Sequence, residues 1–554
     1  MNKNRAMQLV AFVYMILAIG CTKIPNHAHY IPKDALLVGA VDMNKLGKKM
    51  IWNAITGSEL FDEMQKDFKN EKSKEAMKDF SSVGLNQNST IYFFYTGSLR
   101  RDSKICFLVG MKNQSQFEEF IQKNLQGVTI QSKSNYKSAQ IESSVYAAWN
   151  KDVAMFFPLG KISDSVQANI GINTEFNTIK SVEEFLATAF NIDKEKSITS
   201  LAHFKDLQKS GHDVSFWANY EEIFNQNQDL NTSEMQAFIK KDYFKDAALA
   251  TGVDFEKGAT EVEMDYYMSD DLANIYKKYS TDNVNADLIK RIPSKDIAMM
   301  MSYNLKPQMI QDFLKKFNLD GLANLGLMMM GTSMDKLAST FKGDMVFAIT
   351  DLNLKDTVKK IPNSDLELVV NPEMNFTFAM SIQDESAVEK FLNKGVKENV
   401  LTKNGNVYAM ASSESAIIKN KDLLVFSSKQ TMAQQYVDGG SNAKGVLPGE
   451  VWKNVTSSPI GLYIDINKIL QFLPDDEMNE DDKLLMEETK KMFTYFEMHG
   501  GHMKNNANHL EGNLFFTNKD ENSLLQIINL AMKVKKNADK NAASKSAKDT
   551  SIVL

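Results

Sequence analysis

Short apolar blocks, separated by amphipathic helical stretches, run along most of the chain. Residues 104–111 are largely apolar, as in a strand, while residues 115–121 repeat apolar side chains at the spacing of one helix face. Residues 90–95 form another apolar strand shortly before, and the polar turn between the two strands predicts a hairpin. Neighbouring strands followed by helices predict an α+β fold, with mostly antiparallel sheets that helices cover on one side.

One segment alternates strictly between acidic and apolar residues. Its apolar positions are Val262, Met264 and Tyr266, and its acidic positions are Glu261, Glu263 and Asp265. Because successive side chains of a strand point to opposite faces, this segment predicts a strand with one buried and one wet face.

The same order of strands and helices occurs twice along the chain. The matched segments are 31–42 with 292–301, 105–121 with 376–392, 152–157 with 422–426, 214–224 with 460–470, and 252–268 with 501–516. This repetition predicts two tandem related α+β domains, residues 31–280 and residues 286–534, with a hinge near 281–285. The first copy is longer, and we assign the excess to an added amphipathic helix over residues 181–190.

The N-terminal residues have the features of an export signal. Lys3 and Arg5 precede an uncharged apolar run, residues 9–19, which is shorter than the roughly 20 residues needed to span a bilayer. The small residue Gly20 then precedes Cys21, as in the lipobox of bacterial lipoproteins. A buried N-terminal helix with a chance cysteine is the alternative. We predict a signal peptide and lipidation of Cys21, which would anchor the protein to a membrane.

The segments flanking the two predicted domains are polar. Residues 1–20 are the predicted signal peptide, and residues 21–30 are a predicted tether. Bacteroidetes lipoproteins that reach the cell surface, which this chain resembles at its lipobox, have acidic residues directly after the cysteine. The tether has none, so this resemblance implies the periplasmic face of the outer membrane. Residues 535–554 are rich in lysine, alanine and serine, and their lack of aromatic residues predicts a disordered tail.

The lipobox at Cys21, the entry strand at residues 31–42 and the strand–helix plan together resemble a family of Bacteroidetes lipoproteins. That family is known only as a domain of unknown function (four-eight-three-six). The resemblance covers nearly the whole chain and implies this fold and a cell-envelope address. It implies no catalytic residue, because none is assigned in the family.

Charge and cysteine content narrow the possible partners. The chain carries 64 basic and 70 acidic residues, a net charge of −6, and this balance disfavours binding to nucleic acid. It has two cysteines; with Cys21 lipidated, Cys106 has no partner, so we expect no disulfide within a monomer. Cys106 lies in an apolar run and is expected in a buried strand. The methionine-rich segment 328–334 is expected to pack a helix against a sheet.

His499, His502 and His509, with Glu497 nearby, are the best metal candidates, because imidazole and carboxylate together suit zinc or copper. Their spacing argues against a site. A Gly500-Gly501 break separates the first two histidines, which fall on opposite strand faces, and His509 lies beyond a turn. We therefore predict no metal and no cofactor. The acidic stretch 475–482 lacks the glycine of a calcium loop and more simply precedes a helix over residues 484–493.

Three classes of function remain after this elimination. The first is a non-catalytic envelope protein that binds or assembles with a protein, glycan or apolar ligand between two related domains. The second is an enzyme with a carboxylate-based site, because paired acidic residues can do such chemistry. The third is a purely structural subunit of an envelope assembly. The scarcity of histidine and arginine favours a binding or assembly protein over an enzyme.

Overall fold

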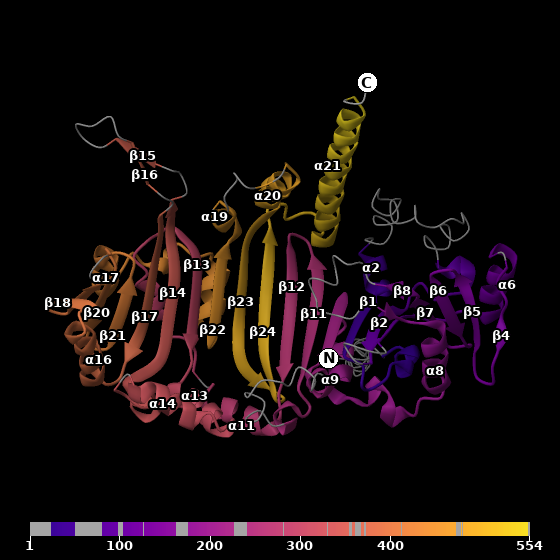
Figure 1. Ribbon diagram of the computed structural model, residues 1–554, viewed down its shortest axis with the longest axis horizontal. Coiled ribbons are helices and arrows are strands. Elements are labelled where there is room, and N and C mark those ends of the chain that lie inside the picture. Colours follow the sequence, from indigo (N-terminus) through magenta and orange to yellow (C-terminus); the bar gives the residue numbers. More distant parts are fainter. Residues whose placement is uncertain are drawn as a thin grey trace, which may run out of the picture. The chain divides into compact units, whose positions relative to one another are not determined.

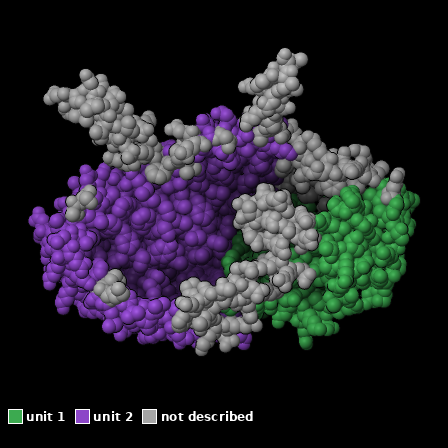
Figure 2. Space-filling model, viewed as in Figure 1, with its two compact units in different colours: residues 1–231, 246–254 green, residues 232–245, 255–554 purple. Residues whose placement is uncertain are grey.

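A computed structural model shows the fold of this protein. It describes residues 24–49, 80–97, 103–125, 127–161, 175–226, 241–280, 282–329, 331–353, 357–360, 367–370, 373–410, 413–471, 478 and 480–551. The chain forms two compact units, shown in separate colours in Figure 2. Unit 1 comprises residues 1–231 and 246–254, and unit 2 comprises residues 232–245 and 255–554.

Unit 1 contains an antiparallel sheet (Figure 1). Its strands, in order of neighbours, are β4 (Gln131–Ser132), β5 (Lys137–Glu142), β6 (Val145–Trp149), β7 (Val153–Pro158), β3 (Lys104–Gly110), β2 (Thr90–Thr96), β1 (Leu37–Asp42), β10 (Val214–Asn219) and β11 (Ala248–Glu256). Its helices include α2 (Met43–Lys48), α6 (Gln114–Asn124), α8 (Ile179–Ala189), α9 (Ala202–Ser210) and α10 (Tyr220–Gln226). The predicted hairpin over residues 90–111 is confirmed as β2 and β3.

Unit 2 is built on a longer antiparallel sheet (Figure 1). Its strands, in order of neighbours, are β12 (Ala259–Tyr267), β24 (Ala507–Phe516), β23 (Phe493–Lys504), β22 (Ile460–Asp465), β13 (Ile297–Asn304), β14 (Phe341–Asn353), β17 (Glu373–Ile382), β21 (Leu423–Ser427), β20 (Ala416–Asn420), β19 (Val407–Met410) and β18 (Leu401–Asn404). A separate pair, β15 (Thr357–Lys360) and β16 (Glu367–Val370), projects from it.

The described helices of unit 2 lie in the connections between its strands, except for the last one, which follows the last strand. They are α11 (Asp270–Tyr279), α12 (Ala286–Lys290), α13 (Pro307–Lys316), α14 (Asp320–Met329), α15 (Met334–Thr340), α16 (Glu385–Lys397), α17 (Gln430–Val437), α18 (Gly449–Thr456), α19 (Ile466–Leu470), α20 (Glu480–Met492) and α21 (Ser523–Ser551). The helix expected over residues 484–493 is confirmed as α20. The α+β class with antiparallel strands is likewise confirmed.

Helices pack against both faces of part of the unit 2 sheet, rather than against one face only. On β21, Leu423 and Val425 join a core that includes Tyr436 of α17. Leu424 points to the other face and packs with a second cluster that includes Leu392 of α16. The reason is visible in the strand itself, since its consecutive positions are apolar and a strand directs alternate residues to opposite faces.

The two units share an order of neighbouring strands. In unit 1 the order β7-β3-β2-β1-β10-β11 is found, and in unit 2 the order β21-β17-β14-β13-β22-β23. The chain last passes from unit 1 to unit 2 between residues 254 and 255, whereas the hinge was expected at 281–285, and the duplication itself stays a prediction. The helix expected at 181–190 is confirmed as α8. In the other unit a helix, α17, likewise follows β21, so if the units are related copies α8 has a counterpart and is not the added segment.

Both flanking segments are more ordered than expected. The predicted tether ends early, because residues 26–30 form a 3-10 helix in which the His27 side chain is buried. Its Nε2 lies 2.7 Å from the carbonyl oxygen of Thr90, and its ring packs edge-on against Tyr92. The predicted disordered tail is instead the continuation of α21 to Ser551. Alanine and lysine favour a helix when no glycine or proline interrupts them.

Candidate functional site

Unit 1 contains a cavity of about 1020 Å³. Its wall is formed by the C-terminal end of α8, the segment that leads to α9, the end of β10 and the start of α10. Trp217 of β10 lines it and packs edge-on against Phe204 of α9. A volume of this size is at the upper end of what small-molecule sites occupy.

Backbone-to-side-chain hydrogen bonds hold the polar side of this cavity in place. Asn219, the last residue of β10, accepts from the backbone N–H of Glu222 through Oδ1, at 3.1 Å, and so caps the start of α10. The backbone N–H of Asp246 donates to Oε2 of Glu221 at 2.9 Å. These contacts aim a carboxylate-rich helix N-terminus at the cavity.

Acidic residues outnumber lysines around the cavity. The carboxylates are Asp34, Asp193, Glu195, Glu221, Glu222 and Asp246, and the lysines are Lys33 and Lys196. Nζ of Lys196 lies 3.9 Å from Oδ2 of Asp193, so the charge of this lysine is paired with one of the lining carboxylates. The cavity therefore favours a neutral or positively charged ligand over an anionic one.

In unit 2, histidines and carboxylates meet on one face of three adjoining strands. Strand register sets Asp265 of β12 opposite His509 of β24, and Glu263 opposite Glu511. On the next strand, β23, His499 is opposite Glu511. Because all these positions alternate with apolar ones, their side chains share one sheet face.

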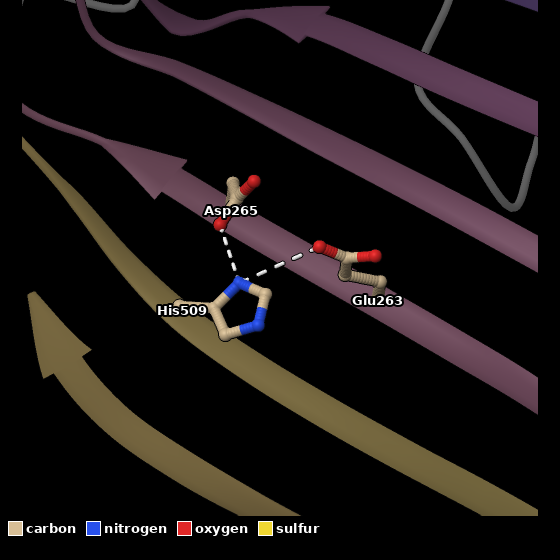
Figure 3. Close-up of side chains that lie close together, drawn as sticks. All are labelled: Glu263, Asp265 and His509. Atoms are coloured by element: carbon tan, nitrogen blue, oxygen red, sulfur yellow. Dashed lines mark hydrogen bonds and ion pairs between the residues drawn. The ribbon is translucent and has the colours of Figure 1, made fainter. Parts of the chain in front are cut away.

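His509 is the centre of this cluster, and Figure 3 shows its Nδ1 directed toward two carboxylates of β12. The Nδ1 atom lies 2.7 Å from Oδ1 of Asp265 and 3.8 Å from Oε1 of Glu263. Its Nε2 lies 3.2 Å from Oε1 of Glu511. The hydrogen bond with Asp265 raises the pKa of His509, and burial opposes this only in part.

His499 extends the cluster toward the core. Its Nε2 lies 3.5 Å from Oε2 of Glu511, and its Nδ1 lies 3.4 Å from Oε2 of Glu497. Burial by itself lowers the pKa of His499, but the adjacent carboxylates outweigh it and the pKa is raised. The Glu497 side chain is fully buried, and its Oε1 accepts from Asn454 and Asn513, at 2.9 and 2.8 Å.

The structure joins two of the three candidate histidines through Glu511. The third, His502, is opposite His509 in the strand register, but its Nε2 lies 3.1 Å from Oδ1 of Asn283 instead. Glu263 and Asp265 were not among the predicted site residues. Their segment does not have the expected buried and wet faces, because Tyr266 of the apolar set is 37% exposed whereas the side chain of Asp265 is 24% exposed. No local pattern indicates that β12 pairs with β24.

The remaining predicted residues have varied outcomes. Cys21 lies outside the described residues. Cys106 is a buried residue of β3, as expected. Met328 does not pack α14 against a sheet, because its side chain is 68% exposed. Among the described residues, no helix is long and apolar enough to cross a membrane.

Comparison with known proteins places most of the chain in one family. Residues 27–426 match the model of a family described as a domain of unknown function, DUF4836. No curated protein matches this chain. Among solved structures, crystal forms IV and III of a protein called TP0453 are similar over 43% and 47% of this chain, and 80% and 88% of their own. Their sequence identities are 7% and 8%, and their TM-scores are 0.23 and 0.25.

Proposed function

The chain belongs to the DUF4836 family, a domain of unknown function, and from that premise we propose that it is a lipid-anchored binding protein of the bacterial cell envelope. In this proposal, the cavity of unit 1 takes a ligand that is positively charged or rich in hydroxyl groups. The protein holds this ligand without transforming it. The observation that carries the proposal is the acidic cavity beside Trp217.

The chemistry of the cavity supports binding of such a ligand. Carboxylates that line a cavity attract cations and accept hydrogen bonds from hydroxyl groups. Trp217 adds apolar surface to the cavity wall, although with 4% of it exposed it offers a ligand contact with only a small part of its ring. A glycan or a lysine-rich peptide segment offers both kinds of group.

The anchor rests on the N-terminal sequence. A positively charged start, an apolar run and a small residue before Cys21 are the features that a lipoprotein signal peptide requires. Lipid chains on Cys21 would hold the protein on a membrane, because each buried methylene contributes about 0.8 kcal/mol. We place the protein on the outer membrane, facing the periplasm, because the tether has no acidic cluster after the cysteine. The folded chain begins within a few residues of Cys21, so unit 1 would lie close to the membrane.

Titration calorimetry tests the ligand. The full-length chain, purified in detergent, is titrated with an oligolysine peptide, a neutral oligosaccharide and an oligoaspartate. We expect binding of at least one of the first two and none of the third. The double variant Glu221→Gln/Glu222→Gln should weaken that binding at least tenfold, while each glutamine keeps an oxygen acceptor.

A matched control separates the cavity from the protein surface. Glu119 of α6 is exposed and remote from the cavity, so Glu119→Gln should leave binding unchanged. Equal loss in the control and the cavity variant would contradict the proposal. If the protein converts any of these probes, and if the conversion is lost when one of these carboxylates is substituted, the protein is a carboxylate-based enzyme instead.

Cell fractionation tests the anchor. Cys21→Ala should release the protein from the membrane fraction or leave an uncleaved precursor. A Cys21→Ala protein that is fully cleaved and still membrane-bound would contradict lipidation. Protease treatment of intact cells reports the membrane face, and we expect protection.

A second candidate role, assembly with another envelope protein, is favoured by one surface feature. Helix α14 exposes Leu322, Leu325 and Met328, at 65%, 60% and 68%. Their three-residue spacing places them along one side of the helix. Clustered exposed apolar residues mark interaction surfaces. Leu325→Lys should reduce cross-linking of the native lipoprotein to its neighbours without reducing binding in the cavity.

A further inference from the structure

We propose that Glu263, Asp265 and His509 form a binding site for a divalent transition-metal ion, across strands β12 and β24 of unit 2. The site is separate from the cavity of unit 1 and does not depend on the function proposed for it. The sequence predicted no metal site, because the pairing of His509 with Glu263 and Asp265 on another strand cannot be read from the sequence.

The positions of the three side chains are compatible with one ion. One atom from each side chain, Nδ1 of His509 and a carboxylate oxygen of Glu263 and Asp265, all lie within 4.8 Å of one another. Around a tetrahedral ion with bonds of about 2.1 Å, neighbouring ligand atoms are about 3.4 Å apart. The Nδ1–oxygen separations of 2.7 and 3.8 Å bracket this value. Small rotations of the side chains would therefore place all three around a common centre (Figure 3).

The second nitrogen of the imidazole supplies an independent observation. Metal-binding histidines commonly donate their other ring N–H to a carboxylate, which orients the ring and increases its basicity as a ligand. Here Nε2 of His509 lies 3.2 Å from Oε1 of Glu511. The other oxygen of Glu511 lies 3.5 Å from Nε2 of His499. Glu511 therefore orients the ring of His509 and is itself in contact with His499, which leaves Nδ1 of His509 directed toward β12.

The charges around His509 favour a cation. Its ring contacts three carboxylates, those of Glu263, Asp265 and Glu511. Even a protonated imidazole supplies only one positive charge to these three contacts, whereas a divalent ion would supply two and would leave the imidazole neutral. The side chains are accessible to an entering ion, because Glu263 is 37% exposed, Asp265 24% and His509 18%.

The ligand types select the class of ion. One imidazole nitrogen with two carboxylate oxygens suits zinc or a similar first-row ion, whereas calcium prefers oxygen ligands only, and more of them. Three protein ligands leave a further position for water. Such an ion would also tie β12 to β24, because its ligands come from both strands.

Zinc binding to the full-length chain in detergent tests this proposal. Equilibrium dialysis with zinc chloride, followed by elemental analysis, should find about one zinc ion per chain. His509→Gln and Asp265→Asn should each weaken binding at least tenfold. His502→Gln is the matched control, because His502 is opposite His509 on β23 but outside the ligand set. It should bind like the unaltered protein.

Thermal unfolding provides the second readout. Zinc should raise the midpoint of the unaltered protein and of His502→Gln but not of the ligand variants, since a ligand that binds only the folded state stabilises it. Calcium chloride should raise none of them. Thermal unfolding in the presence of chelator shows which variants are folded. If a ligand variant does not fold, Glu263→Gln, which alters the most exposed ligand, takes its place. Absence of stoichiometric zinc, or equal binding by folded ligand variants and the control, would overturn the proposal.

Discussion

Nδ1 of His212 and Oδ2 of Asp254 lie 2.7 Å apart, in a hydrogen bond that joins the turn before β10 to strand β11. The other oxygen of Asp254 accepts from the backbone N–H of Asp213 at 3.0 Å, and Nζ of Lys45 lies 3.5 Å from it. Burial opposes ionisation of Asp254, but these contacts outweigh it and lower its pKa from 3.8 to about 2.

The lowered pKa of Asp254 predicts a loss of stability in acid. A carboxyl group whose pKa is depressed by folding stabilises the protein fully above its unfolded pKa, and this contribution is lost as the pH falls from about 4 to about 2. Since Asp254 is partly solvated, we expect Asp254→Asn to cost about 1–2 kcal/mol at pH 7. Urea unfolding at pH 7 and pH 2.5 measures both values. The difference between variant and unaltered protein should shrink at the lower pH; an equal difference at both would contradict this account.

Asn454 of α18 is predicted to stabilise unit 2 through the buried Glu497. Its Nδ2 donates to Oε1 of Glu497 at 2.9 Å, and Asn454→Ala would remove that donor from a fully buried carboxylate. A buried acceptor that loses a partner costs about 1–3 kcal/mol. Asn518 is the control, because its side chain forms only solvent-exposed hydrogen bonds, to Glu521 and from the backbone N–H of Asp520. Asn518→Ala should therefore change the free energy of unfolding less than Asn454→Ala. Equal effects in urea unfolding would show that the Asn454 bond contributes nothing specific.

Gly440 is predicted to accept no side chain. Its φ is +67°, and a Cβ there would lie 2.1 Å from the backbone carbonyl oxygen of Arg291. Gly440→Ala should therefore cost more than about 2 kcal/mol. Gly440→Asn should be no milder, because asparagine tolerates the positive φ but still carries the Cβ.

Gly445 serves as the control for this comparison, because a Cβ there meets no atom within 4 Å. Gly445→Ala should change the free energy of unfolding by less than about 0.5 kcal/mol. Recovery of stability in Gly440→Asn relative to Gly440→Ala would show that the backbone angle, and not the contact with Arg291, sets the cost.

Cys106 is predicted to be unreactive in the folded protein. Its side chain is fully buried in β3, and burial raises the pKa of the thiol well above its ordinary value. In Cys21→Ala, where it is the remaining cysteine, a chromogenic disulfide reagent should modify it only as the chain unfolds. The rate should rise with urea in parallel with unfolding. Rapid modification without urea would contradict the buried position of this thiol.

Local patterns were sufficient to predict many of the individual elements. The strands at residues 90–95 and 104–111, the helices at 181–190 and 484–493, and the burial of Cys106 all follow from periodicity over a few residues. Such periodicity depends on which face of a strand or helix is buried, and that is recorded in adjacent residues.

What the sequence by itself determined is therefore the kind of elements and their order. Only the tertiary structure decided which strands are neighbours. Asp265 and His509 are 244 residues apart in the chain, and they meet because β12 pairs with β24 in one register. Periodicity within a strand specifies which face is buried but not its partner strand. That choice follows from the packing of whole sheets and helices, and it alone brings the imidazole to the two carboxylates.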